Sequence, residues 1–392
     1  MTRPLSVALS LSSFVLALMP ACGGEPAARR EQAAASEPAG APGPGSSEAS
    51  APGVREDGEI VSAVKWFEGD FEAALSAAKA EGKLIFMDVG AYWCPPCRKL
   101  EEQVFVRADV GAALSAKYVS LHVDAEKGEG PELVARYKVQ AYPTLLVLDA
   151  NGVEKGRLVD AMEPEELLAA LEKIAAGGDP LKELEDKVAA APDDLQARYE
   201  LAVGYALAAR RDAAEAEFAR VIAGDPDNAK GLAAKAMADR AGFVVAKLDG
   251  DPERAIALYR ELQAKFPRAK ESVQAYRQIG RQLHKLGRDD EAIASLEAMV
   301  ATDPNDVDLK VSYGWFSFRE RCRPEAALKV VDAGVAQAAD RPDLHYIRAE
   351  LLHLLGRDGE ALAAIREAAR LEPESAFFKR QVRRFQELSG GT

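Results

Sequence analysis

One spacing recurs along the C-terminal half of the chain and limits the folds available to it. An alanine is followed four residues later by an apolar residue and twelve residues later by a proline. The complete copies are Ala214, Phe218, Pro226; Ala255, Tyr259, Pro267; Ala292, Leu296, Pro304; and Ala361, Ile365, Pro373. A fifth copy begins at Ala326 and Val330, but its proline, Pro342, comes four residues late. Because the segment is rich in Ala, Leu, Glu and Arg and lacks the alternation of a strand, this spacing predicts repeated helix pairs, each closed by a proline.

A small residue also stands twelve positions before the key alanine in four copies: Ala202, Gly280, Gly314 and Ala349. Small residues let two paired helices approach closely. The pattern resembles the tetratricopeptide repeat (TPR), a helix-turn-helix of 34 residues, and Pro192 to Pro226 is one such step. We therefore expect an all-α TPR solenoid over residues 181–388, with about seven extra residues near 243–251. The prediction is a lone first helix, five helix pairs and a final capping helix.

The resemblance implies that the concave face of the solenoid binds protein or peptide partners. By repeat phase, Arg277 and Arg281 belong to that face. Trp315 and Phe318 either lie on it or pack between helices, and packing is the commoner use of an apolar stripe. Lys379, Arg380, Arg383 and Arg384 form a basic patch on the last helix, which we interpret as a solvated face or a contact with anionic lipid headgroups.

The charge and the rare residues exclude several functions. Lys+Arg number 50 against 63 Asp+Glu, a net charge of -13, and nucleic-acid binding needs the opposite balance. Four histidines and four cysteines are too scattered for a metal centre or a disulfide-stapled scaffold. We expect no metal, no organic cofactor and no nucleic-acid partner. Cys322 lacks an evident partner and is interpreted as a spare thiol.

The N-terminus has the layout of a secretory signal. Residues 1–22 carry one early Arg, an apolar run from Leu5 to Met19 and small residues before Cys22. This layout resembles the lipobox of bacterial lipoproteins, which implies lipidation of Cys22; the alternative is an ordinary cleaved signal before an incidental cysteine. Residues 23–58 are mostly Ala, Pro, Gly, Ser and Glu and are expected to form a disordered linker. The expected location is the bacterial cell envelope, facing the periplasm, and Gly23 weakly favours the outer membrane.

Residues 59–177 read as a mixed α/β unit. Short apolar runs at 84–89, 118–123 and 144–148 predict buried strands, and a further strand is expected near 156–159 after the Asn151-Gly152 turn. Helices are expected over 71–79, from Pro95, over 131–137 and over 163–176. Gly177-Gly178-Asp179-Pro180 ends this unit.

The chemistry of this unit lies in Trp93-Cys94-Pro95-Pro96-Cys97. Two cysteines separated by two residues can close a small disulfide ring. At the start of a helix the first sulfur meets the positive end of the helix dipole, which favours the nucleophilic thiolate. Prolines suit a first helical turn and stiffen the ring. A CxxC motif in a βαβ context indicates redox activity.

With these residues the unit resembles the thioredoxin fold, and residues 83–124 are similar to the C-terminal domain of DsbD-type thiol:disulfide interchange proteins. The resemblance implies that Cys94 attacks a substrate disulfide, that Cys97 resolves the mixed disulfide, and that buried Asp88 exchanges a proton with Cys97. Glu101, four residues after Cys97, corresponds to a second acid of that group and either shares this role or lines the helix surface. The resemblance also implies a cis-proline at Pro143. The residues expected to bind substrate are Trp93, Pro95, Pro96, Tyr142 and Pro143.

Taken together, the sequence predicts an α/β thioredoxin fold followed by an all-α TPR solenoid, acting as a thiol-disulfide oxidoreductase on protein dithiols and disulfides. The Pro-Pro dipeptide and bulky Tyr142 depart from general thioredoxins, so the direction of electron flow stays open. The alternatives are an inert disulfide, half of a zinc site, and a non-enzymatic scaffold in which the thioredoxin part is a binding module or a redox switch. His122 is interpreted as a structural residue.

Overall fold

The computed structural model describes residues 52–390. The predicted signal, Cys22 and most of the predicted linker therefore lie outside the described residues. The end of that linker takes part in a β-hairpin, in which β1 (Gly53–Val54) pairs antiparallel with β2 (Ile60–Val61). Among the described helices, none combines the length and the apolar character that a membrane span requires.

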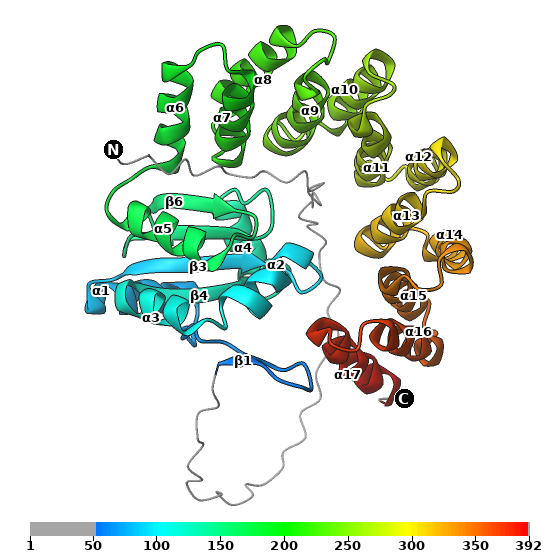
Figure 1. Ribbon diagram of the computed structural model, residues 1–392, viewed down its shortest axis with the longest axis horizontal. Coiled ribbons are helices and arrows are strands. Elements are labelled where there is room, and N and C mark those ends of the chain that lie inside the picture. Colours follow the sequence, from blue (N-terminus) through cyan, green and yellow to red (C-terminus); the bar gives the residue numbers. More distant parts are fainter. Residues whose placement is uncertain (1–51, 391–392) are drawn as a thin grey trace, which may run out of the picture.

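A four-stranded mixed sheet forms the centre of the N-terminal domain (Figure 1). Its order is β4-β3-β5-β6, with β3 (Leu84–Gly90) parallel to β4 (Tyr118–Asp124) and antiparallel to β5 (Thr144–Leu148), which pairs with β6 (Glu154–Val159). Beside β4, Trp66 forms a single parallel bridge with Ser120. The four strands predicted near 84–89, 118–123, 144–148 and 156–159 are confirmed.

Helices cover both faces of this sheet because β3 is buried on both. Ile85, Met87 and Val89 pack on the face that carries α1 (Phe71–Glu81) and α4 (Gly130–Arg136). Phe86 packs on the other face, against α3 (Ala108–Lys117) and α5 (Pro164–Ala175). The alternation follows from the two-residue period of a strand. α2 (Pro95–Lys99) and the π-helix η1 (Leu100–Val104) continue from the end of β3.

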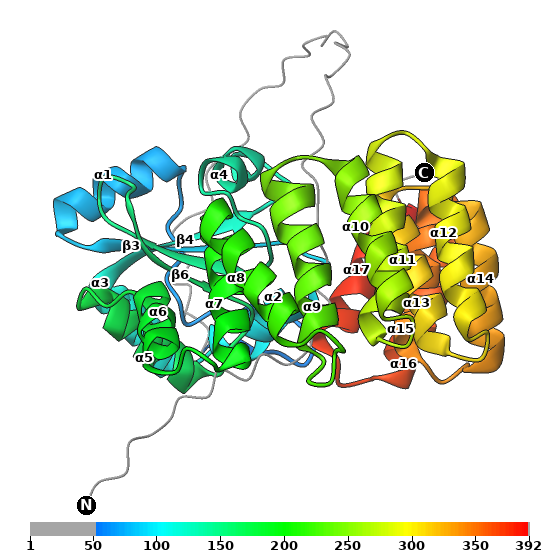
Figure 2. The same cartoon turned by 90° about the horizontal axis from the view of Figure 1, so that it is seen from above.

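The rest of the described chain is helical, and its helices curve around the α/β domain (Figures 1 and 2). The first helix, α6 (Pro180–Ala190), is followed by helix pairs and by α17 (Ala376–Gly390). The pairs are α7 (Leu195–Leu207) with α8 (Arg211–Gly224); α9 (Leu232–Asp239) and η2 (Arg240–Leu248) with α10 (Pro252–Lys265); α11 (Lys270–Lys285) with α12 (Asp289–Thr302); α13 (Val307–Glu320) with α14 (Pro324–Gln337); and α15 (Pro342–Leu354) with α16 (Asp358–Leu371). Within each of the later pairs the first helix faces the α/β domain (Figure 1).

The small residues of the repeat occupy close helix contacts, as their spacing predicts. Ala202 and Ala349 are fully buried. A Cβ added at Gly314 would lie 2.5 Å from Ile347 Cγ2 and 2.7 Å from Val331 Cγ2. Trp315 and Phe318 pack between helices, with their rings 5.7 Å apart and both next to Tyr346 of α15.

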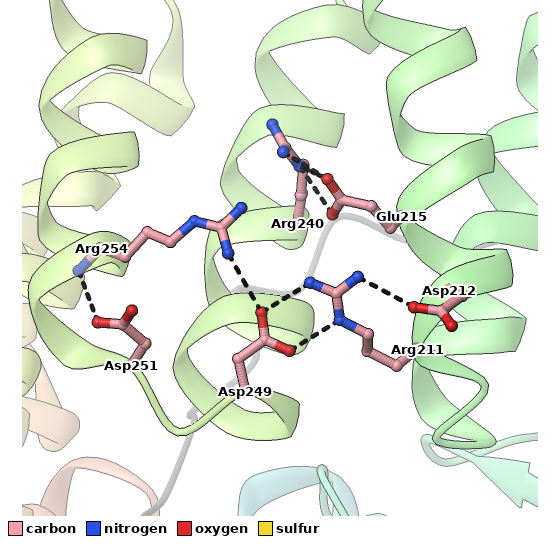
Figure 3. Close-up of polar contacts among 7 residues, drawn as sticks. All are labelled: Arg211, Asp212, Glu215, Arg240, Asp249, Asp251 and Arg254. Carbon is pink, nitrogen blue, oxygen red and sulfur yellow. Dashed lines mark hydrogen bonds and ion pairs between the residues drawn. The ribbon is translucent and has the colours of Figure 1, made fainter.

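The extra residues near 243–251 are wound into η2, which continues α9 without a break. An ion-pair network holds this insertion to its neighbours (Figure 3). Asp249, just after η2, accepts from Arg211 Nε of α8 at 2.8 Å and lies 3.5 Å from Arg254 of α10, while Arg240 pairs with Glu215. These side chains are partly exposed, with Arg240 and Glu215 at 24% each, so solvent screens the network and it positions η2 more than it stabilises the fold.

The basic patch on α17 has a different role from either one expected. Arg380 donates to Glu102 at 2.7 Å and to the carbonyl of Gly58 at 3.0 Å, and Arg383 donates to the carbonyl of Asp57. Arg384 is paired with the buried carboxylate of Glu350. Arg380 and Arg383 therefore fasten the end of the solenoid to the hairpin and to η1, where acidic and carbonyl acceptors of the first domain meet them.

Candidate active site

Cys94 and Cys97 form a disulfide at the start of α2, shortly after the end of β3, with their Cα atoms 5.3 Å apart. Cys94 is the N-cap of α2, and its Sγ accepts a hydrogen bond from the N–H of Cys97 at 3.3 Å. Pro95 and Pro96 occupy the first turn, where their missing N–H groups cost no helical hydrogen bond. In the reduced state the Cys94 thiolate would therefore lie at the positive end of the helix dipole.

The loop before β5 lies beside this disulfide. The Tyr142–Pro143 peptide bond is cis, and Pro143 is buried. The Tyr142 ring packs edge-on to Trp93, with ring centroids 6.3 Å apart, and this contact brings the loop against the residue before Cys94. Burial raises the pKa of Tyr142 to about 12, so its hydroxyl stays protonated at neutral pH.

Asp88 lies behind the disulfide. A Cβ on Gly90 would be 3.2 Å from Cys97 Sγ, so this face of β3 packs directly against the second cysteine. Asp88 is two residues earlier on the same strand and therefore on the same face. Its side chain is buried, at 3% exposure, and its Oδ1 has no hydrogen-bond partner. A buried carboxylate oxygen with a free lone pair beside a thiol is suited to accept a proton.

His122, for which the sequence predicts a structural role, is the partner of this carboxylate. Its Nδ1 lies 3.0 Å from Asp88 Oδ2, while the imidazole is 41% exposed. Burial opposes its positive charge, but the hydrogen bond to Asp88 and the nearby carboxylates outweigh burial and raise the His122 pKa. Strand register could have revealed the pair, because Asp88 and His122 are each the fifth residue of parallel neighbours β3 and β4.

Glu101 lies in η1, one turn beyond Cys97. Burial raises the pKa of this carboxyl, and His122 and Asp88 both act on it electrostatically. The structure thus brings Glu101 into the electrostatic neighbourhood of Asp88 and His122.

The solenoid covers the disulfide, a feature that no motif or periodicity predicts. Cys94 is 2% and Cys97 5% exposed, and both belong to the same apolar cluster as residues of the helical repeats. The Arg319 guanidinium of α13 stands 2.9 Å from the centre of the Trp93 ring and pairs with Glu126 at 3.0 Å. Arg98 of α2 in turn stacks over Phe377 of α17, 3.6 Å from its ring centre. No periodicity predicts such contacts, because they join residues more than 190 positions apart.

Comparison with known proteins agrees with this geometry. A thioredoxin-like domain model matches residues 71–175. Thioredoxin-1 of Drosophila melanogaster is 38% identical over 82 residues, which cover 21% of this chain and 70% of that protein. The chain belongs to the thioredoxin family. The DsbD 2 thiol:disulfide interchange protein of Pseudomonas aeruginosa is 39% identical over 87 residues, 22% of this chain but only 15% of that relative's length.

Beyond the thioredoxin domain, tetratricopeptide-repeat models match residues 174–241, 249–307 and 317–376. The predicted fold class is therefore confirmed: a thioredoxin-like α/β domain followed by TPR helices. Among solved structures, a putative disulphide-isomerase from Bacteroides thetaiotaomicron shares 38% sequence identity, covers 30% of this chain and 97% of its own, and has a TM-score of 0.28.

Outside the thioredoxin site, the described residues hold one group with metal-ligand chemistry: His284, Asp289 and Cys322. His284 Nδ1 lies 2.7 Å from Asp289, and the same pairing recurs between His353 and Asp358 at 2.6 Å, where no cysteine is part of such a group. The His–Asp pair is thus a repeated contact at the start of a second helix. Burial raises the pKa of Cys322 to about 11, which keeps its thiol protonated and unreactive at neutral pH.

Proposed function

We propose that this chain is a cell-envelope thiol-disulfide oxidoreductase whose helical repeats dock the protein partner. The observation that carries the proposal is the Cys94–Cys97 disulfide at the start of α2, with the buried, half-satisfied carboxylate of Asp88 on the strand face that meets Cys97. The relatives whose names describe thiol:disulfide interchange match this part of the chain.

The reaction is a two-electron transfer in two steps. The Cys94 thiolate attacks one sulfur of a substrate disulfide, forms a mixed disulfide and releases one substrate thiolate. Cys97 passes its proton to Asp88 and attacks Cys94 Sγ, which releases the second substrate thiolate and closes the Cys94–Cys97 disulfide. The substrate gains two electrons and the enzyme loses two. The same steps in reverse would oxidise a protein dithiol.

The remaining site residues shape the surface around the sulfurs. Trp93 shields the disulfide, and Pro95 and Pro96 stiffen its ring. Tyr142 and Pro143 form the loop along which substrate backbone would lie. Glu101 would share the proton-accepting task with Asp88, and exposed His122 would connect Asp88 to solvent.

The location is part of the same proposal. Residues 1–22 would act as a lipoprotein-type signal, with Cys22 lipidated, and the linker after it would hold the folded domains away from the membrane. The domains would face the periplasm, with the outer membrane weakly favoured.

Cysteine variants of the full chain test the activity. Cys94→Ser is expected to abolish reduction of a disulfide-bonded peptide, while Cys97→Ser is expected to trap a Cys94 mixed disulfide visible by mass spectrometry. Cys322→Ser is the matched control, because it removes a buried thiol that takes no part in the disulfide, and it should keep full activity. Equal activity in Cys94→Ser and wild type would refute the proposal.

Burial of the disulfide favours a second candidate function, in which the redox state switches partner binding and turnover is not the role. The contacts of Arg319 with Trp93 and of Phe377 with Arg98 would then change with the redox state of the sulfurs and pass that change to the solenoid. Partner capture by oxidised and reduced protein separates the two. A partner that binds only one redox state, together with no turnover of any disulfide substrate, would favour the switch.

A further inference from the structure

The helical repeats wrap around the thioredoxin domain and are joined to it differently at their two ends (Figure 1). At one end, residues 176–179 connect α5 directly to α6, so the chain itself holds the solenoid to the domain. At the other end, α17 meets the domain through non-covalent contacts. Cys94 is buried in one apolar cluster with residues of the repeats, so a polypeptide reaches it only when part of this cover moves.

The hairpin of residues 53–61, formed by β1 and β2, connects the two domains at this second end. Its base is held to the thioredoxin domain, since the N–H of Ala63 donates to the carbonyl of Phe105 at 2.7 Å, just after η1. Each strand has only two residues, and a two-stranded hairpin is at best marginally stable alone. Gly58 is the one residue of the hairpin that is buried. The position of the hairpin tip therefore depends on what it contacts.

The tip of the hairpin contacts α17 through its backbone. Arg380 donates to the carbonyl of Gly58 at 3.0 Å, and Arg383 donates to that of Asp57. Gly58 has a φ of 85°, and a Cβ added there would lie 2.7 Å from the carbonyl oxygen of Ala376. Because a helix backbone cannot move aside as a flexible side chain can, this close approach requires glycine at the tip.

Beneath the hairpin, α17 contacts the segment that carries the disulfide. Arg380 pairs with Glu102 of η1 at 2.7 Å, and Phe377 lies against Arg98, the residue after Cys97. The side chains of Arg380 and Glu102 are 22% and 23% exposed, so solvent weakens their attraction. Movement of α17 away from α2 would therefore break a few weak contacts and uncover the start of α2, while the covalent connection at the other end stays intact.

We infer that the hairpin of residues 53–61 is a clasp that controls access to Cys94, whose role in exchange rests on the proposed function. While the tip lies on α17, the cover is closed. When the tip leaves, α17 moves away from α2, and a polypeptide enters at this end while the α6 end stays closed.

Labelling of the reduced protein measures how often the clasp opens, without any turnover. The full chain is reduced and treated with a bulky maleimide, and mass spectrometry follows the label on Cys94 over time. Gly58→Ala should be labelled about tenfold faster than wild type, because overpacking against the Ala376 carbonyl favours the open state. An unchanged rate would overturn the clasp.

Gly82→Ala is the matched control for backbone strain. Gly82, at the end of α1, also has a positive φ, 64°, but a Cβ there would meet nothing within 4 Å. This variant should be labelled at the wild-type rate. Equal acceleration in the two glycine variants would assign the effect to strain and refute the clasp.

A contact near the covalent connection tests which end opens. Gln140 Nε2 donates to the carbonyl of Ala206 in α7 at 2.6 Å, and Gln140→Met removes this bond at similar volume. We expect the wild-type labelling rate, because residues 176–179 keep this end closed. Acceleration as large as in Gly58→Ala would show that the whole cover loosens together, against the inference.

Arg383→Gln changes the same contact from the side of α17 and keeps the test decisive if Gly58→Ala does not fold. Loss of its bond to Asp57 should raise the labelling rate about threefold to tenfold. Arg366→Gln is its control, since it removes the same charge from an exposed position on the outer helix α16. Equal rates in the two arginine variants would overturn the clasp.

The clasp and the proposed function fail separately. If Cys94→Ser abolishes exchange while Gly58→Ala and Arg383→Gln are labelled at the wild-type rate, the proposed function stands and the clasp is refuted. If both clasp variants are labelled faster but the wild-type chain exchanges no disulfide, the clasp stands and the proposed function is refuted.

Discussion

The pairing of Asp88 with His122 links a buried carboxyl group to a partly exposed imidazole. Asp88 has 3% exposure, whereas the His122 imidazole is 41% exposed and 3.0 Å away. A cationic imidazole attracts the Asp88 carboxylate, to which the proposed mechanism assigns the Cys97 proton. His122 is in this account a positioning residue, because it acts on the sulfurs only through Asp88.

His122→Gln should therefore slow the resolving step in a pH-dependent way. We expect resolution of the mixed disulfide to be about threefold to tenfold slower at pH 6, where His122 is charged, and nearer to wild type at pH 8.5. Stopped-flow measurement at both pH values checks this. His353→Gln is the control, because His353 of α15 forms a similar pair with Asp358 within the solenoid, and an identical pH profile in both variants would rule out a role in exchange.

The same pair predicts how stability depends on pH. Since the pKa of His122 is raised in the folded state, its stabilising effect is complete below the unfolded value of about 6.5 and is lost as pH rises through the folded value. The difference in unfolding free energy between wild type and His122→Gln should therefore shrink between about pH 5.5 and 8.5. Urea unfolding across that range measures it, and a difference that grows with pH would contradict the assignment.

Among the helices, Gly314 shows why the repeat has a small residue at this position. It allows α13 to approach α14 and α15 so closely that no side chain fits. Gly314→Ala should cost about 1–3 kcal/mol in unfolding free energy, because Ile347 and Val331 must move. Gly359→Ala in α16, where a Cβ meets nothing within 4 Å, should instead be neutral or gain up to about 1 kcal/mol. Denaturant unfolding compares the two, and equal effects would contradict the packing argument.

Helices, strands and close helix contacts could be predicted where nearby residues determine them. The strand at 144–148, the helix from Pro95 and the buried alanines of the repeats follow from periodicity, prolines and small residues. The Asp88–His122 pair needed strand register, which local patterns do not specify. The solenoid covers the disulfide through single long-range contacts, such as that of Arg319 with Trp93. The local sequence around either residue does not predict these contacts.

Over the whole molecule, the solenoid and the thioredoxin domain share one interface around the sulfurs. Besides Arg319 and Arg98, Gln140 Nε2 donates to the carbonyl of Ala206 at 2.6 Å and Arg157 to that of Leu207 at 2.5 Å. The contacts therefore run from α7 to α17. Since Cys94 is 2% exposed, exchange with a protein substrate requires part of this interface to open.

Weakening the interface should make the thiols more reactive. We expect the double variant Arg319→Gln/Arg380→Gln, once reduced, to react about tenfold faster than wild type with a bulky thiol reagent, because it loses two charged contacts that hold the cover closed. Arg366→Gln again serves as the control. Unchanged reactivity in the double variant would show that the cover does not limit access.

The reduction potential of the Cys94–Cys97 pair, measured on the full chain by equilibration with glutathione, tests the central claim most directly. If the chain is a thiol-disulfide oxidoreductase, the pair should form a reversible redox couple. We expect its reduction potential to lie between about -270 mV, as in thioredoxin, and about -120 mV, as in DsbA, and its value indicates the direction of electron flow. A pair that forms no reversible disulfide, or one that stays oxidised below about -300 mV as structural disulfides do, would contradict it.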